Sequence, residues 1–147
     1  MSLFQLLSVS GSGMSSQRQR AEVLVENLAS AETTRTPDGG PYRRRDVVFE
    51  SAEQTTPFSA IYTDNLDGGG GPQGVRVSEI RTDNREPERR YVPGHPDADE
   101  TGYVAFPRLN PAEEMVDLMN ANRGYQANAA AFTAARDMIL RSIDLMK

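Results

Sequence analysis

The sequence predicts an α+β fold, in which long N- and C-terminal helices pack as a coiled-coil-like pair and a small β-rich middle domain lies between them in the chain. Apolar residues follow a helical period only in residues 3–31 and 111–146. The stretch between them instead shows short alternating segments bounded by glycine and proline. We therefore expect an N-terminal helix within residues 1–34, a middle domain over 35–109 and a C-terminal helix within 110–147.

Both helical segments repeat apolar residues at alternating steps of three and four, which is typical of a coiled-coil seam. Seven of the nine seam positions are apolar in each segment. The residues expected to form the assembly interface are Leu7, Met14, Ala21, Leu24 and Leu28 in the first helix, and Leu118, Ala121, Tyr125, Phe132, Ala135, Ile139 and Met146 in the second. Seams of this length, which one chain cannot fully bury, predict association with other subunits, because burial of apolar area yields about 25 cal/mol per Å².

The first helix has a weak stretch at Ser10-Gly11-Ser12-Gly13. Each glycine there costs roughly 0.5–1 kcal/mol in a helix interior, although a packed helix can use such small residues for close approach. We expect the helix to end near Thr33-Thr34. The run Thr36-Pro37-Asp38-Gly39-Gly40-Pro41 follows, and its prolines and glycines predict a tight turn.

The middle domain is predicted to hold five short strands, in residues 45–50, 58–63, 74–81, 88–92 and 102–106. Four consecutive glycines lie between the second and third, so residues 67–73 are expected to form a flexible loop. This loop does not match a phosphate-binding motif, because no Gly-Lys-Ser/Thr follows it.

The second helix has a clear predicted start. Asn110 is a favourable N-cap, Pro111 suits the first helical position, and Glu113 can complete a capping box. Many alanines then favour a continuous helix, which at ~1.5 Å per residue would reach about 50 Å.

Composition excludes several functional classes. The chain has 147 residues, a formal charge of −5, a hydrophobic fraction of 37% and no cysteine. Mild acidity argues against nucleic acid binding, and no apolar run approaches the ~20 residues of a membrane span. The N-terminal region lacks the pattern of a cleaved signal peptide, which predicts a cytoplasmic protein or export by a route without cleavage. The arginine clusters at 43–45 and 89–90 fit a solvated strand face, or ion pairs with a neighbouring subunit.

No catalytic or metal-binding motif is evident in the sequence, so we expect neither enzymatic activity nor a cofactor. His95, the only histidine, lies in a Pro-Gly-His-Pro turn and favours a structural role. Asp97, Asp99 and Glu100 alternate like the start of a calcium loop, but the glycine and distant glutamate of an EF-hand are missing. Glu113 and Glu114 lie in a helical first turn, where the helix dipole favours acidic residues.

Several motifs resemble the FlgC family of flagellar basal-body rod proteins, and the resemblance covers nearly the whole chain. They include Glu26-Asn27-Leu28-Ala29, the turn that begins at Thr36 and continues through Tyr42-Arg43-Arg44, Pro93-Gly94-His95-Pro96 and Arg123-Gly124-Tyr125-Gln126-Ala127-Asn128. Ser30 and Glu32 stand where the family pattern has asparagines, and Arg108 replaces the asparagine expected after Pro107.

The resemblance implies a non-enzymatic subunit of the proximal rod, which would transmit torque across the periplasm. It implies export through the flagellar type III apparatus without cleavage, and helical assembly with itself and other rod subunits. Alternatives are a distal rod or hook subunit, a type III export chaperone that pairs its helices within a dimer, and an enzyme acting on the cell wall. The short middle domain argues against a hook subunit, and the lack of a paired-carboxylate motif argues against the enzyme.

Overall fold

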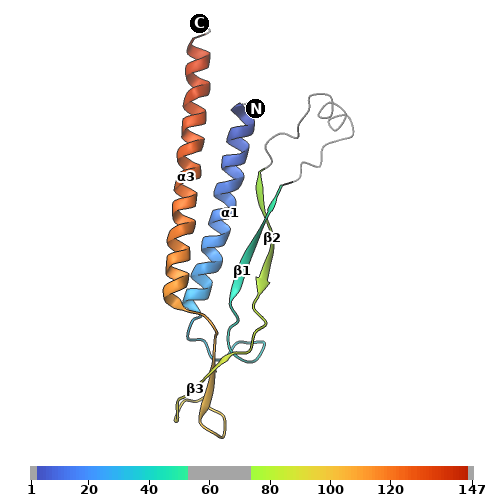
Figure 1. Cartoon of the computed structure of the whole chain (residues 1–147), viewed down its shortest axis with the longest axis vertical. Helices are drawn as coiled ribbons and strands as arrows, with labels where there is room; N and C mark the ends of the chain where they lie inside the picture. The colour runs from blue at the N-terminus through green and yellow to red at the C-terminus, as the bar shows by residue number, and fades with distance from the viewer. Residues whose placement is uncertain (1–2, 53–73, 146–147) are drawn as a thin grey trace, which may run out of the picture. The chain divides into compact units, whose positions relative to one another are not determined.

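A computed structural model describes residues 3–52 and 74–145 and confirms the α+β class (Figure 1). Its elements are α1 (Leu3–Ala29), β1 (Arg45–Ser51), β2 (Val75–Thr82), β3 (Glu88–Tyr91), β4 (Tyr103–Phe106) and α3 (Pro111–Asp144). Both terminal helices and four of the five predicted strands are present. The strand expected at 58–63 and the glycine loop at 67–73 lie outside the described residues.

The chain forms two compact units, each built from parts of both helices. The first unit comprises residues 1–19, 49–78 and 122–147, and the second comprises residues 20–48 and 79–121. Each unit is described by itself below.

Helix α1 runs without a break through its glycines. A Cβ at Gly13 would lie 2.9 Å from Asn128 Nδ2 of α3, whereas a Cβ at Gly11 would meet nothing within 4 Å. Gly13 therefore leaves room for the Asn128 side chain in the first unit, whereas Gly11 faces open space. The helix ends at Ala29, so the predicted end near Thr33-Thr34 is wrong. Ser30 N still donates to Glu26 O at 3.0 Å, after which the chain turns.

Helix α3 begins where the sequence predicts. Asn110 Oδ1 accepts from Ala112 N at 3.1 Å, as an N-cap does. Glu113 accepts a hydrogen bond from the Asn110 side-chain amide at 3.2 Å, so it supports the cap through the side chain and completes the predicted box in altered form.

The two helices pack antiparallel in both units. In the first, Gly13 lies beside Asn128 and Gly124 lies beside Gln17, so the partner number falls as the α1 number rises. In the second, Arg20 forms an ion pair with Asp117 at 3.7 Å, and Asn27 Nδ2 donates to Glu114 Oε2 at 2.9 Å. Here too the α3 residue number falls as the α1 number rises.

The strands form two separate two-stranded sheets. At the end of the β1–β2 pair in the first unit, Ala52 N donates to Gly74 O at 2.7 Å. Strands β3 and β4 are antiparallel, with Arg90 opposite Val104 and Tyr91 opposite Tyr103. The rings of Tyr91 and Tyr103 meet edge to face at 5.4 Å between centroids, which is a favourable aromatic pair.

The hydrophobic core is small. Its buried hydrophobic residues are Ala135 in the first unit, and Val23, Leu24, Tyr42, Val104 and Ala121 in the second. Many large apolar side chains of α3 remain exposed. The single chain therefore leaves much apolar surface in water, as its sequence composition predicts.

The turn after α1 requires glycine at two successive positions. Gly39 and Gly40 have φ of 86° and 81°, and Gly40 O accepts from Thr36 N at 2.8 Å. We expect Gly39→Val with Gly40→Val to lower the free energy of unfolding by about 2–4 kcal/mol, since each left-handed L-residue costs roughly 1–2 kcal/mol. Urea denaturation measures this.

The matched control is Gly11→Ala, which lies in α1 with open space around the added methyl group. It should stabilise the chain by about 0.5–1 kcal/mol, because alanine has the higher helix propensity. An unchanged urea midpoint for the Gly39/Gly40 double variant would show that the turn does not contribute to folding.

Candidate assembly interface

A buried polar network joins the end of α1 to the start of β1 and the start of α3 in the second unit. At its centre is Asn27, whose side chain is 0% exposed. Its Nδ2 donates to Arg45 O at 2.8 Å and to Glu114 Oε2 at 2.9 Å. Its Oδ1 accepts from the Tyr42 hydroxyl at 2.9 Å and from Arg45 N at 3.0 Å. Every donor and acceptor of the amide is thus paired.

Glu114 is the buried charge of this network, with 2% exposure. Its Oε1 accepts from Arg44 Nε, while Oε2 accepts from Asn27. Arg44 also lies 3.5 Å from Asp46 and 3.9 Å from Asp117. A buried carboxylate of this kind is tolerated only when it is paired and hydrogen-bonded, so Asn27 and Arg44 fix where α3 can begin.

The electrostatics of the network follow from burial and from Glu114. Burial raises the pKa of the Tyr42 hydroxyl, and the charges of Glu26 and Glu114 add to this rise, while Arg45 opposes it. For Arg44, burial alone would lower the pKa, but the hydrogen bond and charge of Glu114 outweigh it and the pKa is raised. Arg44 is therefore held cationic against the carboxylate.

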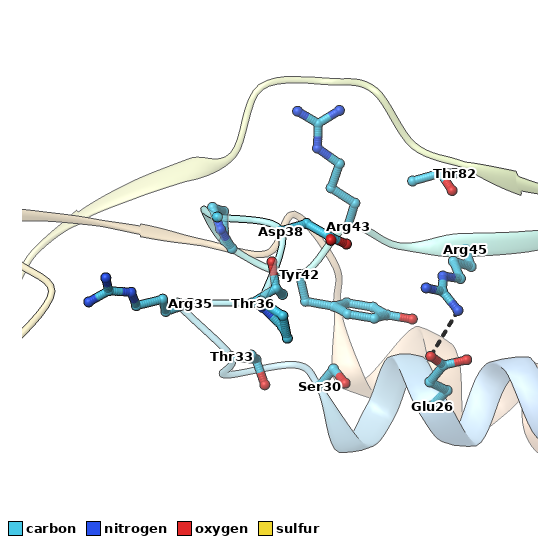
Figure 2. Close-up of a pocket in the computed structure, with 13 residues that line it drawn as sticks. Glu26, Ser30, Thr33, Arg35, Thr36, Asp38, Tyr42, Arg43, Arg45 and Thr82 are labelled. Atoms are coloured by element: carbon cyan, nitrogen blue, oxygen red, sulfur yellow. Dashed lines mark hydrogen bonds and ion pairs between the residues drawn. The ribbon is translucent and has the colours of Figure 1, made fainter.

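A hollow of about 500 Å³ opens beside this network, between the end of α1, the turn at residues 33–41 and β1 (Figure 2). The Tyr42 ring points toward α1 (Figure 2). Arg45 forms an ion pair with Glu26, with 2.9 Å between Arg45 Nη1 and Glu26 Oε1. Arg35 and Arg43 extend away from the centre of the hollow (Figure 2). The lining mixes both charge signs with Ser and Thr hydroxyls, and it contains no nucleophile beside a general base.

The histidine and the two aspartates of the turns at 93–101 have structural partners. His95 Nδ1 accepts from Asp97 N at 3.1 Å, and the His95 ring lies edge-on to Phe106. Asp97 accepts from the Thr34 hydroxyl at 2.7 Å. Asp99 accepts from Thr101 and from Tyr103 N, which closes the loop between β3 and β4. Among residues 3–52 and 74–145, no three His, Cys, Asp or Glu side chains form a metal-binding group.

Most residues of the predicted seam are buried or half-buried within the single chain. Leu24, Ala121 and Ala135 are buried. The half-buried members are Leu7, Met14, Ala21, Leu28, Leu118, Phe132 and Ile139. Met146 lies outside the described residues. These burials concern the single chain, so the role of the residues in assembly stays a prediction.

Tyr125 is 41% exposed in the single chain, and its role in the assembly interface stays a prediction. Gly124 takes the position facing α1, where an added Cβ would lie 3.1 Å from Gln17 Cδ. The predicted pattern skipped glycine because it carries no apolar side chain, yet its lack of one is what admits Gln17.

Sequence reasoning missed the buried pairing of Glu114 with Asn27 and Arg44. It placed Glu114 only in a helical first turn, because the acidic residue type predicts exposure. The available signal was that Asn27 and Arg44 both fall within the family motifs. The connection between them depends on contacts across 87 and 70 positions of sequence.

The exposed apolar residues of α3 lie in two groups. Met115, Val116 and Met119 are each more than half exposed near its start. Met138, Leu140 and Ile143 are exposed toward its end, and Leu145 is exposed just beyond it. In the part of the chain that the structure describes, no helix is both long and apolar enough to cross a bilayer. Apolar faces on long helices with polar rims are typical of protein–protein contact surfaces.

The chain matches a family model over its C-terminal part and curated relatives over its full length. Residues 100–145 match the family model described as flagellar basal body rod FlgEFG protein C-terminal. The chain is 38% identical over 153 residues to the flagellar basal-body rod protein FlgC of Borreliella burgdorferi, covering 100% of this chain and 99% of the relative. It is 37% identical to FlgC of Bacillus subtilis, covering 100% of both. It is 34% identical to FlgC of Salmonella typhimurium, covering 99% of this chain and 98% of the relative.

The family model and the full-length relatives identify the chain as a structural subunit of the bacterial flagellum, and the paired terminal helices are consistent with that class. Within that class, the chain belongs to the FlgC family of flagellar basal-body rod proteins. It is a component of the flagellar basal body, as the resemblance predicts.

We expect Glu114→Ala to lower the free energy of unfolding by about 3–5 kcal/mol, because it leaves Arg44 and the Asn27 amide without their buried partner. Thermal and urea unfolding measure this. The control is Glu113→Ala, one residue away and exposed, which should change stability by less than about 1 kcal/mol. Equal effects at the two positions would show that the buried network does not stabilise the chain.

A second prediction concerns Asp83, which accepts several hydrogen bonds from Arg85. Arg85 Nε donates to Asp83 Oδ1 at 3.0 Å and to Oδ2 at 2.8 Å, and Arg85 N donates to Oδ1 at 2.9 Å. These hydrogen bonds lower the pKa of Asp83 from 3.8 to about 2. A lowered carboxyl pKa contributes stability that is present above pH 3.8 and is lost as the pH falls through about 2.

Arg85→Gln should return the pKa of Asp83 toward its ordinary value, as measured by NMR titration of the carboxyl carbon. Arg43→Gln, whose guanidinium bonds Asn84 at 3.1 Å, is the control and should leave this titration unchanged. A titration of Asp83 near its ordinary pKa in the unaltered chain would contradict the assignment.

Proposed function

We propose that this chain is a structural subunit of the proximal rod that assembles helically with itself and with other rod subunits. In that position it would transmit torque across the periplasm. The observation that carries the proposal is the exposed apolar surface of α3, above all Met115, Val116 and Met119, on a helix whose other face already packs on α1. A heterologous contact between such faces that does not close into a ring generates a helical filament.

The remaining parts of the proposal rest on the family. They are export through the flagellar type III apparatus without signal-peptide cleavage, a lack of enzymatic activity, and a division of labour between two axial helices and the middle domain. We infer no membrane insertion and no nucleic acid partner, in keeping with the mild acidity of the chain.

Native mass spectrometry and cryo-electron microscopy of isolated basal bodies distinguish the alternatives. A rod subunit gives monomers or open oligomers in solution and appears within the rod. A stable dimer in solution, absent from the basal body, would instead identify an export chaperone. Density in the hook or distal rod would relocate the subunit and contradict the proximal assignment.

Phe132→Asp should abolish rod assembly and motility while export continues. The side chain is half-buried, and a charge in an apolar seam costs several kcal/mol. Swarming in soft agar and subunit content of basal bodies measure this, with Phe132→Leu as the conservative control. Normal swarming of Phe132→Asp would overturn the seam assignment.

Met119→Asp separates assembly from folding. Because Met119 is 55% exposed in the single chain, its replacement should change the free energy of unfolding by less than about 1 kcal/mol. The same change should strongly reduce incorporation into the rod. Unimpaired incorporation would show that this face of α3 is not an assembly surface.

A further inference from the structure

Three arginines from separate segments of the second unit line one hollow of about 380 Å³. Arg44 precedes β1, Arg85 lies between β2 and β3, and Arg108 lies between β4 and α3. Glu88 and Glu113 also line it, next to the cap of α3. We call this the arginine-lined hollow.

Internal ion pairs occupy two of the three guanidinium groups. Arg44 is bonded to Glu114, and Arg85 is bonded to Asp83. Glu88, the acidic residue of the lining on β3, is likewise paired with Arg90 at 3.1 Å. Within residues 3–52 and 74–145, the Arg108 side chain has neither a hydrogen bond nor an ion pair. Its charge acts on Asp83 and Glu88 without a direct contact. Arg108 is thus the guanidinium of this hollow whose hydrogen-bond donors remain available.

The backbone presents Arg108 from a fixed position. Pro107 before it is fully buried, and Leu109 N after it donates to Pro107 O at 3.1 Å. Helix α3 begins directly beyond, and its N-terminal peptide dipoles add positive potential beside the guanidinium. An arginine with a fixed backbone loses less freedom on binding than one in a free loop.

The chemistry of the lining selects among anions. A guanidinium binds a carboxylate through two parallel hydrogen bonds. Glu88 and Glu113 at the sides of the hollow repel a dianion such as phosphate more strongly than a single carboxylate. The best fit is therefore a side-chain carboxylate held in place by a protein partner.

We propose that the arginine-lined hollow receives an Asp or Glu side chain of a neighbouring rod subunit, with Arg108 forming the ion pair. This inference rests on the proposed function, since it names the contact chemistry of a subunit already assembled in the rod. It adds an electrostatic contact at the β4–α3 link to the apolar contacts of the helices.

The test uses the scarcity of lysine in this chain, where Lys147 is the only one. Arg108→Lys places an amine in the hollow while keeping its charge. A zero-length carbodiimide couples an amine only to a carboxylate in direct contact. In isolated basal bodies, we expect an intermolecular cross-link from position 108, mapped by peptide mass spectrometry to an acidic residue of a neighbour. The unaltered chain should give none there.

The matched control is Arg89→Lys, an exposed arginine on β3 that does not line the hollow. It should give no comparable cross-link. Charge reversal, Arg108→Glu, should reduce incorporation into basal bodies about tenfold or more, with an unchanged urea midpoint, while Arg89→Glu should not.

Two failures are distinguishable. If the Arg108→Lys subunit is present in basal bodies but gives no cross-link, or no more than Arg89→Lys, the inference is overturned and the proposed function stands. If the unaltered subunit is itself absent from basal bodies, the proposed function fails and the inference fails with it.

Discussion

The buried carboxylate of Glu114 is the constraint on which the second unit depends. Removing this charge from water costs several kcal/mol unless its partners are in place, so the folded unit must bring Asn27 and Arg44 to it at the same time. Those partners come from the end of α1 and the residue just before β1. One charge therefore fixes three chain segments against one another, where an apolar contact would permit sliding.

In the first unit, glycines instead allow the two helices to approach each other closely. Gly13 and Gly124 each leave room for a polar side chain of the opposite helix, Asn128 and Gln17 respectively. Asn128 Nδ2 also donates to Gly124 O at 3.0 Å, so it is anchored on its own helix while it packs against Gly13. The close approach lowers the intrinsic stability of both helices, since glycine is a poor helix former.

These two arrangements leave large apolar side chains of α3 exposed, and we propose that this surface contacts other subunits. The buried stripe of α3 is narrow and made largely of small residues such as Ala121 and Ala135, which add little area to the core. The larger apolar side chains, including Met115 and Met119, point elsewhere and remain in water. Exposed apolar area of this kind can be buried only by contact with another molecule.

Local signals in the sequence determined the helices, the strands and the turn. Period, caps and turn chemistry act over a few residues, so α1, α3, β1 to β4 and the glycines of the turn could all be predicted. The family motifs likewise located Asn27 and Arg44 without explaining them. Only the tertiary structure decided that Glu114 is buried, that Gly124 faces α1, and that Arg108 is left unpaired. Each of these three outcomes depends on which residue from a distant part of the sequence lies opposite. The period of apolar residues along the chain does not carry that information.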